Sequence, residues 1–282
     1  MILMQGIKKM INKKNPLVSV LINNYNKENF CLKAVKSIIE QEYKNVEVVF
    51  YDDNSSDHSL NKIKEFKKKL KIKKLKIIEN KFRQNIFSYN QIEGIRKSLS
   101  KSKGEIICIL DSDDFFKKNK IKKVVDQFSK NKYFEILFDT PIYYYNKKNH
   151  KKINEKYKLR VNKWPSFPPT SCISFRRKGL FSAIKKINIK KNEELWFDFR
   201  IATYFAIKKN QFNLINDTLT YYRQNDFSFD KNYQKYINKK WWKRREEAFN
   251  FLFYLKRDLY NKNMLTLDFL VTKIINKIYS FF

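Results

Sequence analysis

Three apolar runs, each followed by a segment of helical periodicity, constrain the fold of this chain most strongly. The runs are residues 17–22 (LVSVLI), 46–51 (VEVVFY) and 105–110 (EIICIL), and each ends at Asn or Asp. Their apolar residues are nearly continuous instead of alternating with polar ones, which is typical of strands covered on both faces of a parallel sheet. Helical spacing of apolar residues occurs at 29–40, 57–70, 85–99 and 117–128. Strands that alternate with helices predict an α/β domain with a Rossmann-like, mostly parallel sheet flanked by helices.

The regular alternation stops after about residue 133. Short apolar runs at 134–138, 142–145, 171–175, 212–215 and 219–222 indicate further strands, and 193–207 indicates a helix. The stretches 147–170 and 176–195 are expected to be loops. From about residue 233 the pattern is helical again. We therefore expect an N-terminal segment 1–15, an α/β domain 16–230 and a helical C-terminal extension 231–282.

The formal net charge of +33 is the most unusual feature of the composition. A basic chain can bind nucleic acid by neutralising phosphates. The lysines here are spread along the chain and form no single stripe, so the charge indicates a general attraction to anions and no nucleic-acid partner is expected. The same charge suits anionic membrane lipids or a substrate that carries a diphosphate. A non-catalytic nucleic-acid-binding protein is kept as the alternative.

The cysteine pattern and the hydropathy bear on location. Cys31, Cys108 and Cys172 lie far apart and include no Cys-x-x-Cys pair, so neither a zinc site nor a disulfide framework is indicated. This usage fits a reducing, cytoplasmic compartment. No run of about 18 uncharged apolar residues occurs, and no transmembrane helix is expected.

Two acidic clusters stand at the ends of predicted strands. Asp52 and Asp53 follow the second run, and Asp111, Asp113 and Asp114 follow the run 105–110. Asp and Asn also favour turns, which is the ordinary structural explanation. The carboxyl ends of parallel strands meet at one edge of the sheet, where ligands bind. Carboxylates gathered there repel one another unless a cation compensates, and their oxygens suit Mn²⁺ or Mg²⁺ together with substrate phosphates.

Three segments resemble the motifs of family 2 glycosyltransferases. Residues 18–26 (VSVLINNYN) are similar to the first strand of that family, 52–57 (DDNSSD) to its Asp-Asp-Gly-Ser-x-Asp and 110–114 (LDSDD) to its metal-binding Asp-x-Asp-Asp. The order and spacing match over about residues 16–225. The resemblance implies the GT-A fold, with a nucleotide-binding half at about 16–115 and an acceptor half at about 116–230. It also implies an inverting sugar transfer from a nucleotide-diphosphate sugar, with a UDP-sugar as the leading candidate for the donor.

The resemblance also implies roles for particular residues. Asp53 would contact the base of the nucleotide, Tyr25 would line the same pocket, and Asp113 would contact the ribose or the metal. Which of Asp111, Asp113 and Asp114 binds the metal directly stays open. The nucleotide-sugar residues expected from the resemblance are Asn24, Tyr25, Asp52, Asp53, Arg83, Asp111, Ser112 and Asp113, and the metal residues are Asp113 and Asp114.

Two departures from the family pattern affect the site. The family's arginine before the third helix is missing, because Ser88-Tyr89-Asn90 stands in its place. Arg83 or Lys81 is either a replacement phosphate contact or an ordinary surface cation. Asn225 stands where family members often carry a histidine that reaches the metal or the phosphate. These differences leave a degenerate, transferase-like domain as a further alternative.

An inverting displacement needs a base that accepts the proton of the acceptor hydroxyl. Counting back without gaps from residues 212–219 aligns Asp198 with the family's catalytic acid, and Glu193 and Glu194 compete with it. Acids also favour the first turn of a helix for electrostatic reasons alone. The catalytic candidates are therefore Asp198 and Glu194.

The C-terminal extension lies beyond the resemblance. Aromatic and basic residues interleave from Trp241 to the C-terminus. This pattern fits peripheral contact with the inner face of the cell membrane. It fits equally a helical pair that packs on the catalytic domain or on a second subunit of an oligomer. The expected acceptor is a glycan or lipid-linked molecule of cell-surface polysaccharide or lipopolysaccharide synthesis.

Overall fold

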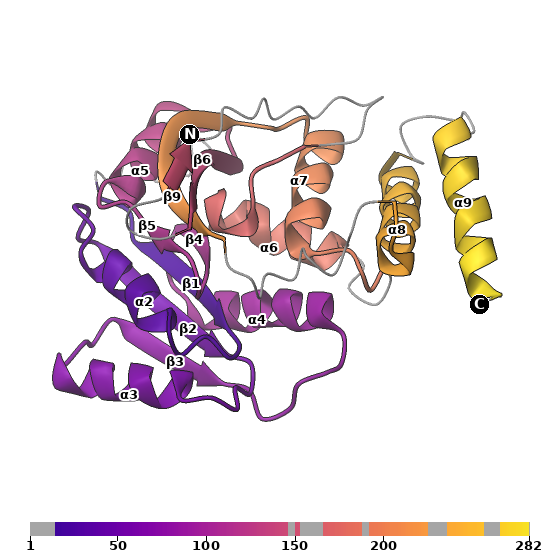
Figure 1. The fold of residues 1–282 in the computed structure, drawn as a ribbon. Helices are drawn as coiled ribbons and strands as arrows, with labels where there is room; N and C mark the ends of the chain where they lie inside the picture. Colours follow the sequence, from indigo (N-terminus) through magenta and orange to yellow (C-terminus); the bar gives the residue numbers. More distant parts are fainter. Residues whose placement is uncertain are drawn as a thin grey trace.

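The computed structural model describes residues 15–145, 150–152, 166–187, 192–224, 236–256 and 266–281. Within these residues nine strands form one sheet, in the order β3-β2-β1-β4-β8-β6-β9-β5 with β7 paired to β6. Helices cover both faces, and α8 and α9 stand beside α7, away from the sheet (Figure 1). The expected N-terminal segment, apart from residue 15, and Asn225 lie outside the described residues.

The first half of the chain follows the predicted alternation. Its elements are β1 (Val18–Asn24), α2 (Cys31–Ile39), β2 (Val46–Asp52), α3 (Ser59–Lys69), β3 (Leu75–Glu79), α4 (Phe87–Lys101), β4 (Ile106–Asp111), β5 (Phe115–Phe116) and α5 (Lys120–Lys130). β1 pairs in parallel with β2 and with β4, and β2 pairs in parallel with β3. The parallel sheet expected from the apolar runs is therefore confirmed.

The second half departs from the sequence-based expectation in four places. Its elements are β6 (Ile136–Tyr144), β7 (His150–Lys152), the 3₁₀ turn η1 (Thr170–Cys172), β8 (Ile173–Arg176), α6 (Arg177–Lys186), α7 (Phe197–Lys208), β9 (Leu214–Arg223), α8 (Lys239–Lys256) and α9 (Leu267–Ser280). The four expected short strands form two longer ones, β6 and β9. The pairing of β6 with β9 shifts register at Asp139–Pro141, and this irregularity accommodates Pro141 and the extra residues of β9. Both expected loops were wrong in part, since β7 lies in 147–170 and pairs with β6, and α6 occupies the first half of 176–195.

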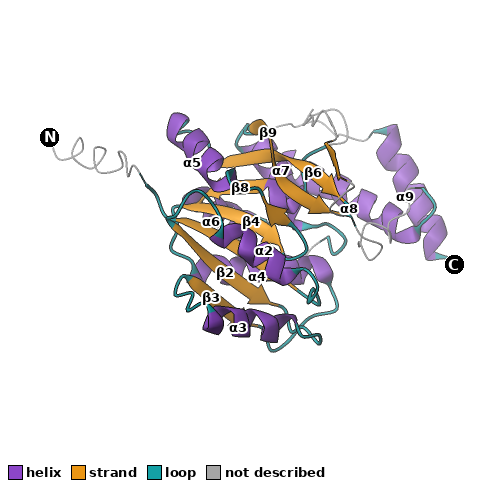
Figure 2. Ribbon diagram, turned by 60° about the vertical axis from the view of Figure 1, so that its left-hand side comes forward, coloured by secondary structure: helices purple, strands orange, loops and turns teal. Residues whose placement is uncertain are grey.

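Two apolar cores lie on opposite faces of the sheet, and alternate residues of β1 serve them. Val20 and Ile22 pack in the core formed with α2, α3 and α5. Leu21 packs in the other core, which α4, α6, α7 and α8 cover. Helices can be followed on either side of the strands in Figure 2. This two-sided burial explains why the strand sequences are continuously apolar.

The C-terminal extension packs on the α/β domain through α8. Ala248, Phe251 and Leu255 of α8 are buried in the same core as Phe199 of α7. The helical character expected for this extension is confirmed. Among the described helices, none combines the length and the hydropathy that a bilayer span requires.

Gly94 lets α4 approach the ends of β1 and β2 closely. A Cβ atom at this position would lie 2.7 Å from a Tyr51 ring carbon and 2.8 Å from the Asn23 side-chain oxygen. Both distances are too short for a non-bonded contact, so the approach requires glycine. The middle of α4 is thereby held against the ends of β1 and β2.

A buried ion pair lies beneath the second acidic cluster. The Lys120 ammonium and the Asp139 carboxylate are 2.7 Å apart, and the two side chains are 0% and 1% exposed. Lys120 also donates hydrogen bonds to the Ser171 carbonyl oxygen (2.7 Å) and to the Thr220 hydroxyl (2.6 Å). These residues come from α5, β6, η1 and β9, so the network joins the second half of the sheet below the site.

Replacing Lys120 with methionine is expected to lower the free energy of unfolding by about 3 kcal/mol, because it leaves the buried Asp139 without its cation. Urea denaturation of both proteins measures the loss. Lys123→Met is the matched control on the same helix: its partner Asp217 is 3.1 Å away, but both side chains are about half exposed. That change is expected to cost less than about 1 kcal/mol. Equal losses in the two variants would contradict the importance of burial.

Candidate functional site

A pocket lies at the carboxyl edge of β2, β1 and β4, the position at which open parallel sheets bind ligands. The beginning of α4, η1, the first turn of α7, the end of β9 and one residue of α8 complete its walls. Eight of the residues singled out in the sequence line it: Asn24, Tyr25, Asp53, Arg83, Asp111, Ser112, Asp113 and Asp198. Asp52, Asp114 and Glu194 do not line it.

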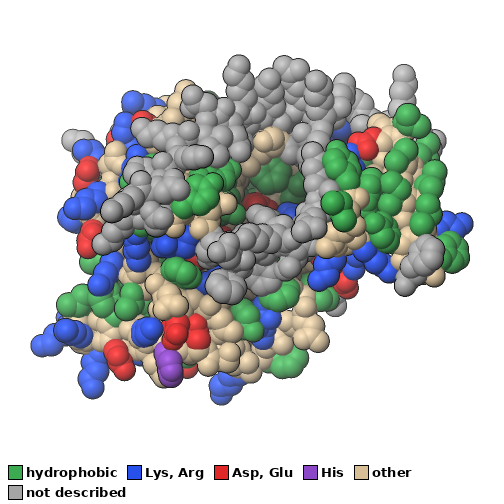
Figure 3. All heavy atoms as spheres, viewed as in Figure 1, with side chains coloured by type: hydrophobic (Ala, Val, Ile, Leu, Met, Phe, Trp, Pro, Cys, Tyr) green, Lys and Arg blue, Asp and Glu red, His purple; other side chains and the backbone are tan. Residues whose placement is uncertain are grey.

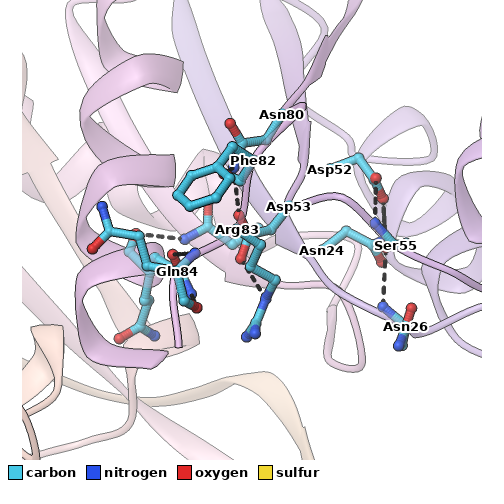
Figure 4. Close-up of polar contacts among 12 residues, drawn as sticks. Asn24, Asn26, Asp52, Asp53, Ser55, Asn80, Phe82, Arg83 and Gln84 are labelled. Carbon is cyan, nitrogen blue, oxygen red and sulfur yellow. Dashed lines mark hydrogen bonds and ion pairs between the residues drawn. The ribbon is translucent and has the colours of Figure 1, made fainter. Parts of the chain in front are cut away.

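Asp52 holds the turn that follows β2. It is 1% exposed, and one carboxylate oxygen accepts hydrogen bonds from the Asn24 amide and from the Ser55 hydroxyl, both at 2.7 Å. The other oxygen accepts from the Ser55 backbone N–H at 3.0 Å (Figure 4). Asn26 and Asn54 have positive φ angles of 50° and 59° in the neighbouring loops, which asparagine tolerates better than most residues. Asp52 therefore shapes the pocket edge from behind.

Asp53 faces the pocket and forms an ion pair with Arg83, whose Nε lies 2.8 Å from the carboxylate. The Asn80 side-chain amide donates to the other oxygen of Asp53 at 2.9 Å (Figure 4). The Arg83 guanidinium lies over the Tyr25 ring, 3.6 Å from its centroid, and 4.5 Å from the Phe87 centroid. Burial raises the pKa of Asp53, although Asn80 and Arg83 oppose this rise. One end of the pocket thus combines aromatic faces with a hydrogen-bonded carboxylate.

Asp111 and Asp113 form the acidic centre of the pocket. Burial raises the pKa of Asp111 to about 7, and the negative charges of Asp113 and Asp198 add to this rise. The Asp113 carboxylate lies 2.6 Å from the Lys27 ammonium. Three carboxylates therefore converge here, and one lysine is paired with one of them.

This acidic centre has the chemistry to hold a divalent cation. In the part of the chain that the structure describes, no group of three His, Cys, Asp or Glu side chains is arranged to hold a metal ion without other ligands. Asp111 and Asp113 supply hard oxygen ligands and excess negative charge. They fit Mg²⁺ or Mn²⁺, which proteins commonly hold with one or two carboxylates while substrate phosphates and water complete the shell.

Asp114 points away from the pocket despite its place in the same motif. It is 2% exposed, and its oxygens accept hydrogen bonds from the Ser171 hydroxyl (2.6 Å) and the Arg223 backbone N–H (2.7 Å). The Ser171 hydroxyl oxygen also accepts a hydrogen bond from the backbone N–H of Asp111 at 3.0 Å. Burial, with Asp113 and Asp111, raises the pKa of Asp114 well above its ordinary value. Asp114 fixes the turn that presents Asp111 and Asp113.

The structure separates the two candidates for the base. Asp198 lies in the first turn of α7, lines the pocket, and is close enough to Asp111 to raise its pKa. Glu194 lies before α7 on the side of α8. Its backbone N–H donates to Glu247 at 2.8 Å, and its carboxylate is 3.8 Å from the Lys243 ammonium. Asp198 is therefore the acid that can reach a ligand in the pocket.

Three cations in the pocket were not identified from the sequence: Lys27, Arg223 and Arg244. Lys27 follows the first motif directly and adjacency could have indicated it. Arg223 belongs to the Tyr-Arg segment at the end of β9, and its Nε donates to the Asp113 carbonyl oxygen at 2.7 Å. Arg244 had no local signal, because only the packing of α8 on the domain brings it to the pocket.

Glu247 connects α8 to the loop before α7, and burial raises its pKa to about 7. The folded state binds the Glu247 proton more tightly than the unfolded state does. The contribution of this group to the stability of the protein is therefore lost as the pH increases from about 4.5 to above 7. Glu247→Gln removes this charge and keeps an acceptor for the Glu194 N–H.

The Glu247→Gln variant is expected to be more stable than the wild type at pH 8 by about 1–2 kcal/mol, after allowance for the partial exposure of the side chain. At pH 5 the gain should be much smaller. Urea denaturation at both pH values measures the difference. An equal gain or loss at pH 5 and pH 8 would contradict the raised pKa.

Comparison with known proteins gives the chain a family. The family model described as glycosyl transferase family 2 matches residues 19–194. An uncharacterized glycosyltransferase of Nostoc sp. is 27% identical over 221 residues, which cover 73% of this chain and 64% of that protein. The Escherichia coli UDP-Glc:alpha-D-GlcNAc-diphosphoundecaprenol beta-1,3-glucosyltransferase WfgD is 30% identical over 116 residues, which cover 41% of this chain and 42% of that protein. The chain thus spans less than two thirds of the length of these relatives.

Two solved structures share the fold. S. aureus TarS 1–349 in complex with UDP-GlcNAc superposes with a TM-score of 0.61 at 16% identity, over 94% of this chain and 71% of that chain. The mannosyltransferase PcManGT from Pyrobaculum calidifontis, in complex with GDP-Man and Mn²⁺, superposes with a TM-score of 0.54 at 14% identity, over 92% and 69% of the two chains. At these identities the likeness concerns the fold alone, which is the GT-A fold.

Proposed function

The chain belongs to glycosyl transferase family 2, and from this premise we propose that it is an inverting transferase that moves a sugar from a nucleotide-diphosphate sugar, in the first place a UDP-sugar, to an acceptor hydroxyl. The observation that supports this proposal is the convergence of three groups in one pocket. These are Asp53 with the Tyr25 ring, Asp111 with Asp113, and Asp198.

We assign the aromatic end of the pocket to the nucleoside. Arg83 covers one face of the Tyr25 ring. A nucleobase would stack on the opposite face, and Asp53 would accept a hydrogen bond from an N–H of the nucleobase. Arg83, which the resemblance suggested as a phosphate contact, pairs with Asp53 and stacks on Tyr25. Its proposed place is therefore beside the base and not beside the diphosphate.

We assign the acidic centre to the diphosphate. Asp111 and Asp113 would hold a Mg²⁺ or Mn²⁺ ion, which would neutralise negative charge on the leaving nucleoside diphosphate. Lys27 and Arg223 line the same part of the pocket and can donate to phosphate oxygens. Asp114 is proposed to support this centre through the turn, without contacting the ligand.

Asp198 is proposed as the catalytic base. As the acceptor oxygen bonds to the anomeric carbon, the bond from that carbon to the diphosphate oxygen breaks and its electron pair leaves with the nucleotide. The hydroxyl proton passes to the Asp198 carboxylate. Attack from the face opposite the leaving group inverts the configuration at that carbon.

Asp53→Ala is expected to weaken UDP binding about tenfold, because the base loses a charged hydrogen-bond acceptor. The ratio of the affinities with and without Mn²⁺ should not change, since Asp53 lies at the other end of the proposed site. Calorimetric titration in Mn²⁺ and in EDTA measures both quantities. Glu79→Ala, which removes a half-exposed carboxylate at the end of β3, is the control. An unchanged UDP affinity in Asp53→Ala would contradict the placement of the nucleobase beside Asp53.

The proposed acceptor is a glycan or a lipid-linked saccharide of cell-surface polysaccharide synthesis, by analogy with the diphosphoundecaprenol-linked acceptor named for the Escherichia coli relative. The proposed setting is the cytoplasm, at the inner face of the membrane. A thermal-shift screen of nucleotide-diphosphate sugars with Mn²⁺ tests the donor class: a bound donor raises the melting temperature. Release of free nucleotide in the presence of an acceptor tests the transfer itself. The proposed activity is wrong if no nucleotide sugar raises the melting temperature and none releases free nucleotide.

A further inference from the structure

α9 has a packed face and an exposed face. On the packed face the Phe269 ring lies 5.4 Å from the Phe249 ring and 4.8 Å from the Phe253 ring of α8, measured between centroids. The Asn276 side-chain amide donates to the Trp242 carbonyl oxygen at 3.0 Å. These contacts fix the rotation of α9 about its axis, and therefore fix which side chains face outward.

The outward face of α9 is an apolar stripe. It consists of Leu267, Leu270, Val271, Ile274, Ile278 and Phe281 at the end of the helix, with exposed fractions from 41% at Val271 to 78% at Leu267. A spacing of three or four residues aligns these side chains on one side of a helix. Figure 3 shows apolar side chains gathered over α9 at the right of the molecule. Single exposed apolar residues are ordinary, but a contiguous stripe marks an interaction surface.

The charges around the stripe are mainly positive. Lys273 and Lys277 lie one turn apart along one border of the stripe. Asp268, the one acid of α9, forms an ion pair with Arg245 of α8. The first turn of α8 adds the exposed Lys239 and Lys240, and the whole chain carries a net charge of +33. An anionic surface would complement this part of the molecule.

From this arrangement we propose that α9 docks the protein on an anionic lipid surface. The apolar stripe would enter the boundary between headgroups and acyl chains, with the helix lying in the plane of the surface. Lys273 and Lys277 are long enough to keep their ammonium groups among the phosphates while their stems follow the stripe. This proposal stands on α9 and its charges, and does not depend on the reaction proposed for the pocket.

The charge also argues against a second copy of the chain as the partner of this stripe. Two molecules that each carry +33 repel one another, and pairing through α9 would bring their lysine-bordered stripes together. Anionic lipids are instead attracted by the same lysines, each by about 1 kcal/mol near the surface, which corresponds to about fivefold in affinity.

Flotation of the full-length protein with phosphatidylcholine vesicles, with and without phosphatidylglycerol, tests the proposal. The wild type is expected to float with the anionic vesicles and to bind neutral vesicles much more weakly. The double variant Ile274→Glu/Ile278→Glu should bind the anionic vesicles at least about tenfold more weakly, because two charges enter the stripe. Lys273→Gln/Lys277→Gln should weaken binding to anionic vesicles about 25-fold, which is fivefold for each lysine, and leave binding to neutral vesicles nearly unaffected.

The matched control is Leu70→Glu/Phe181→Glu, which makes the same kind of change at side chains that are 53% and 52% exposed elsewhere on the surface. It should bind as the wild type does. Circular dichroism of each variant checks that the helices are retained. Absence of wild-type binding, or unchanged binding of Ile274→Glu/Ile278→Glu, would overturn the proposal. A wild-type dimer in sedimentation that becomes a monomer in this variant would also overturn it, since a second copy would then cover the stripe.

Discussion

Asp198→Asn is expected to lower kcat about a thousandfold, because the amide cannot accept the proton of the acceptor hydroxyl. The affinity for UDP should stay nearly the same, since the amide has the shape of the carboxylate and the proposed nucleotide contacts lie elsewhere. The rate of sugar transfer at saturating donor and acceptor measures the first effect. Calorimetric titration with UDP measures the second.

Glu194→Gln provides the comparison for this prediction. Glu194 is the competing acid in the sequence, but it lies off the pocket and beside Lys243. Its replacement should change kcat by less than about tenfold, as expected of a residue outside hydrogen-bond reach of the reacting hydroxyl. If Glu194→Gln were the inactive variant and Asp198→Asn an active one, the base would be wrongly assigned.

Asp113→Asn is expected to lower kcat/KM about a thousandfold, because the site loses a charged ligand for the ion that would stabilise the leaving diphosphate. The same change should abolish the difference between UDP affinities in Mn²⁺ and in EDTA. This result separates Asp113 from Asp53, whose replacement is expected to weaken UDP binding at both conditions equally.

Asp126→Asn is the control for the loss of a carboxylate in this basic chain, because Asp126 is exposed on α5. It should retain the activity and the Mn²⁺ effect of the wild type. An Asp113→Asn protein that loses activity but keeps the full Mn²⁺ effect on UDP binding would show that Asp113 acts otherwise than through the ion.

The sequence predicted the first half of the fold well because its strands are buried on both faces. Residues such as Val20 and Leu21 belong to opposite cores, and this requires a continuous apolar run that is visible without a structure. In the second half, β6 and β9 pair through bulges near Asp139 and Pro141. A bulge changes the register of two strands that are far apart in sequence, so each strand appeared as two short ones.

The acidic clusters show why a motif predicts a site more reliably than the role of each member. Successive side chains at a strand end point to opposite sides, which places Asp53 in the pocket and Asp52 behind it. The position of Asp114 depends on Ser171 and Arg223, which lie 57 and 109 residues further along the chain. No local pattern reveals such partners, and the same limit applied to Arg244.

The central claim is that the pocket at the carboxyl ends of β1, β2 and β4 binds a nucleoside diphosphate with the help of a divalent cation. Calorimetric titration of the wild-type protein with UDP, in Mn²⁺ and in EDTA, tests it most directly. One site is predicted, at least about tenfold tighter in Mn²⁺ than in EDTA, for which UDP-sugars compete. Absence of binding by UDP and GDP alike, or equal affinity for the bound nucleotide in Mn²⁺ and in EDTA, would contradict the claim.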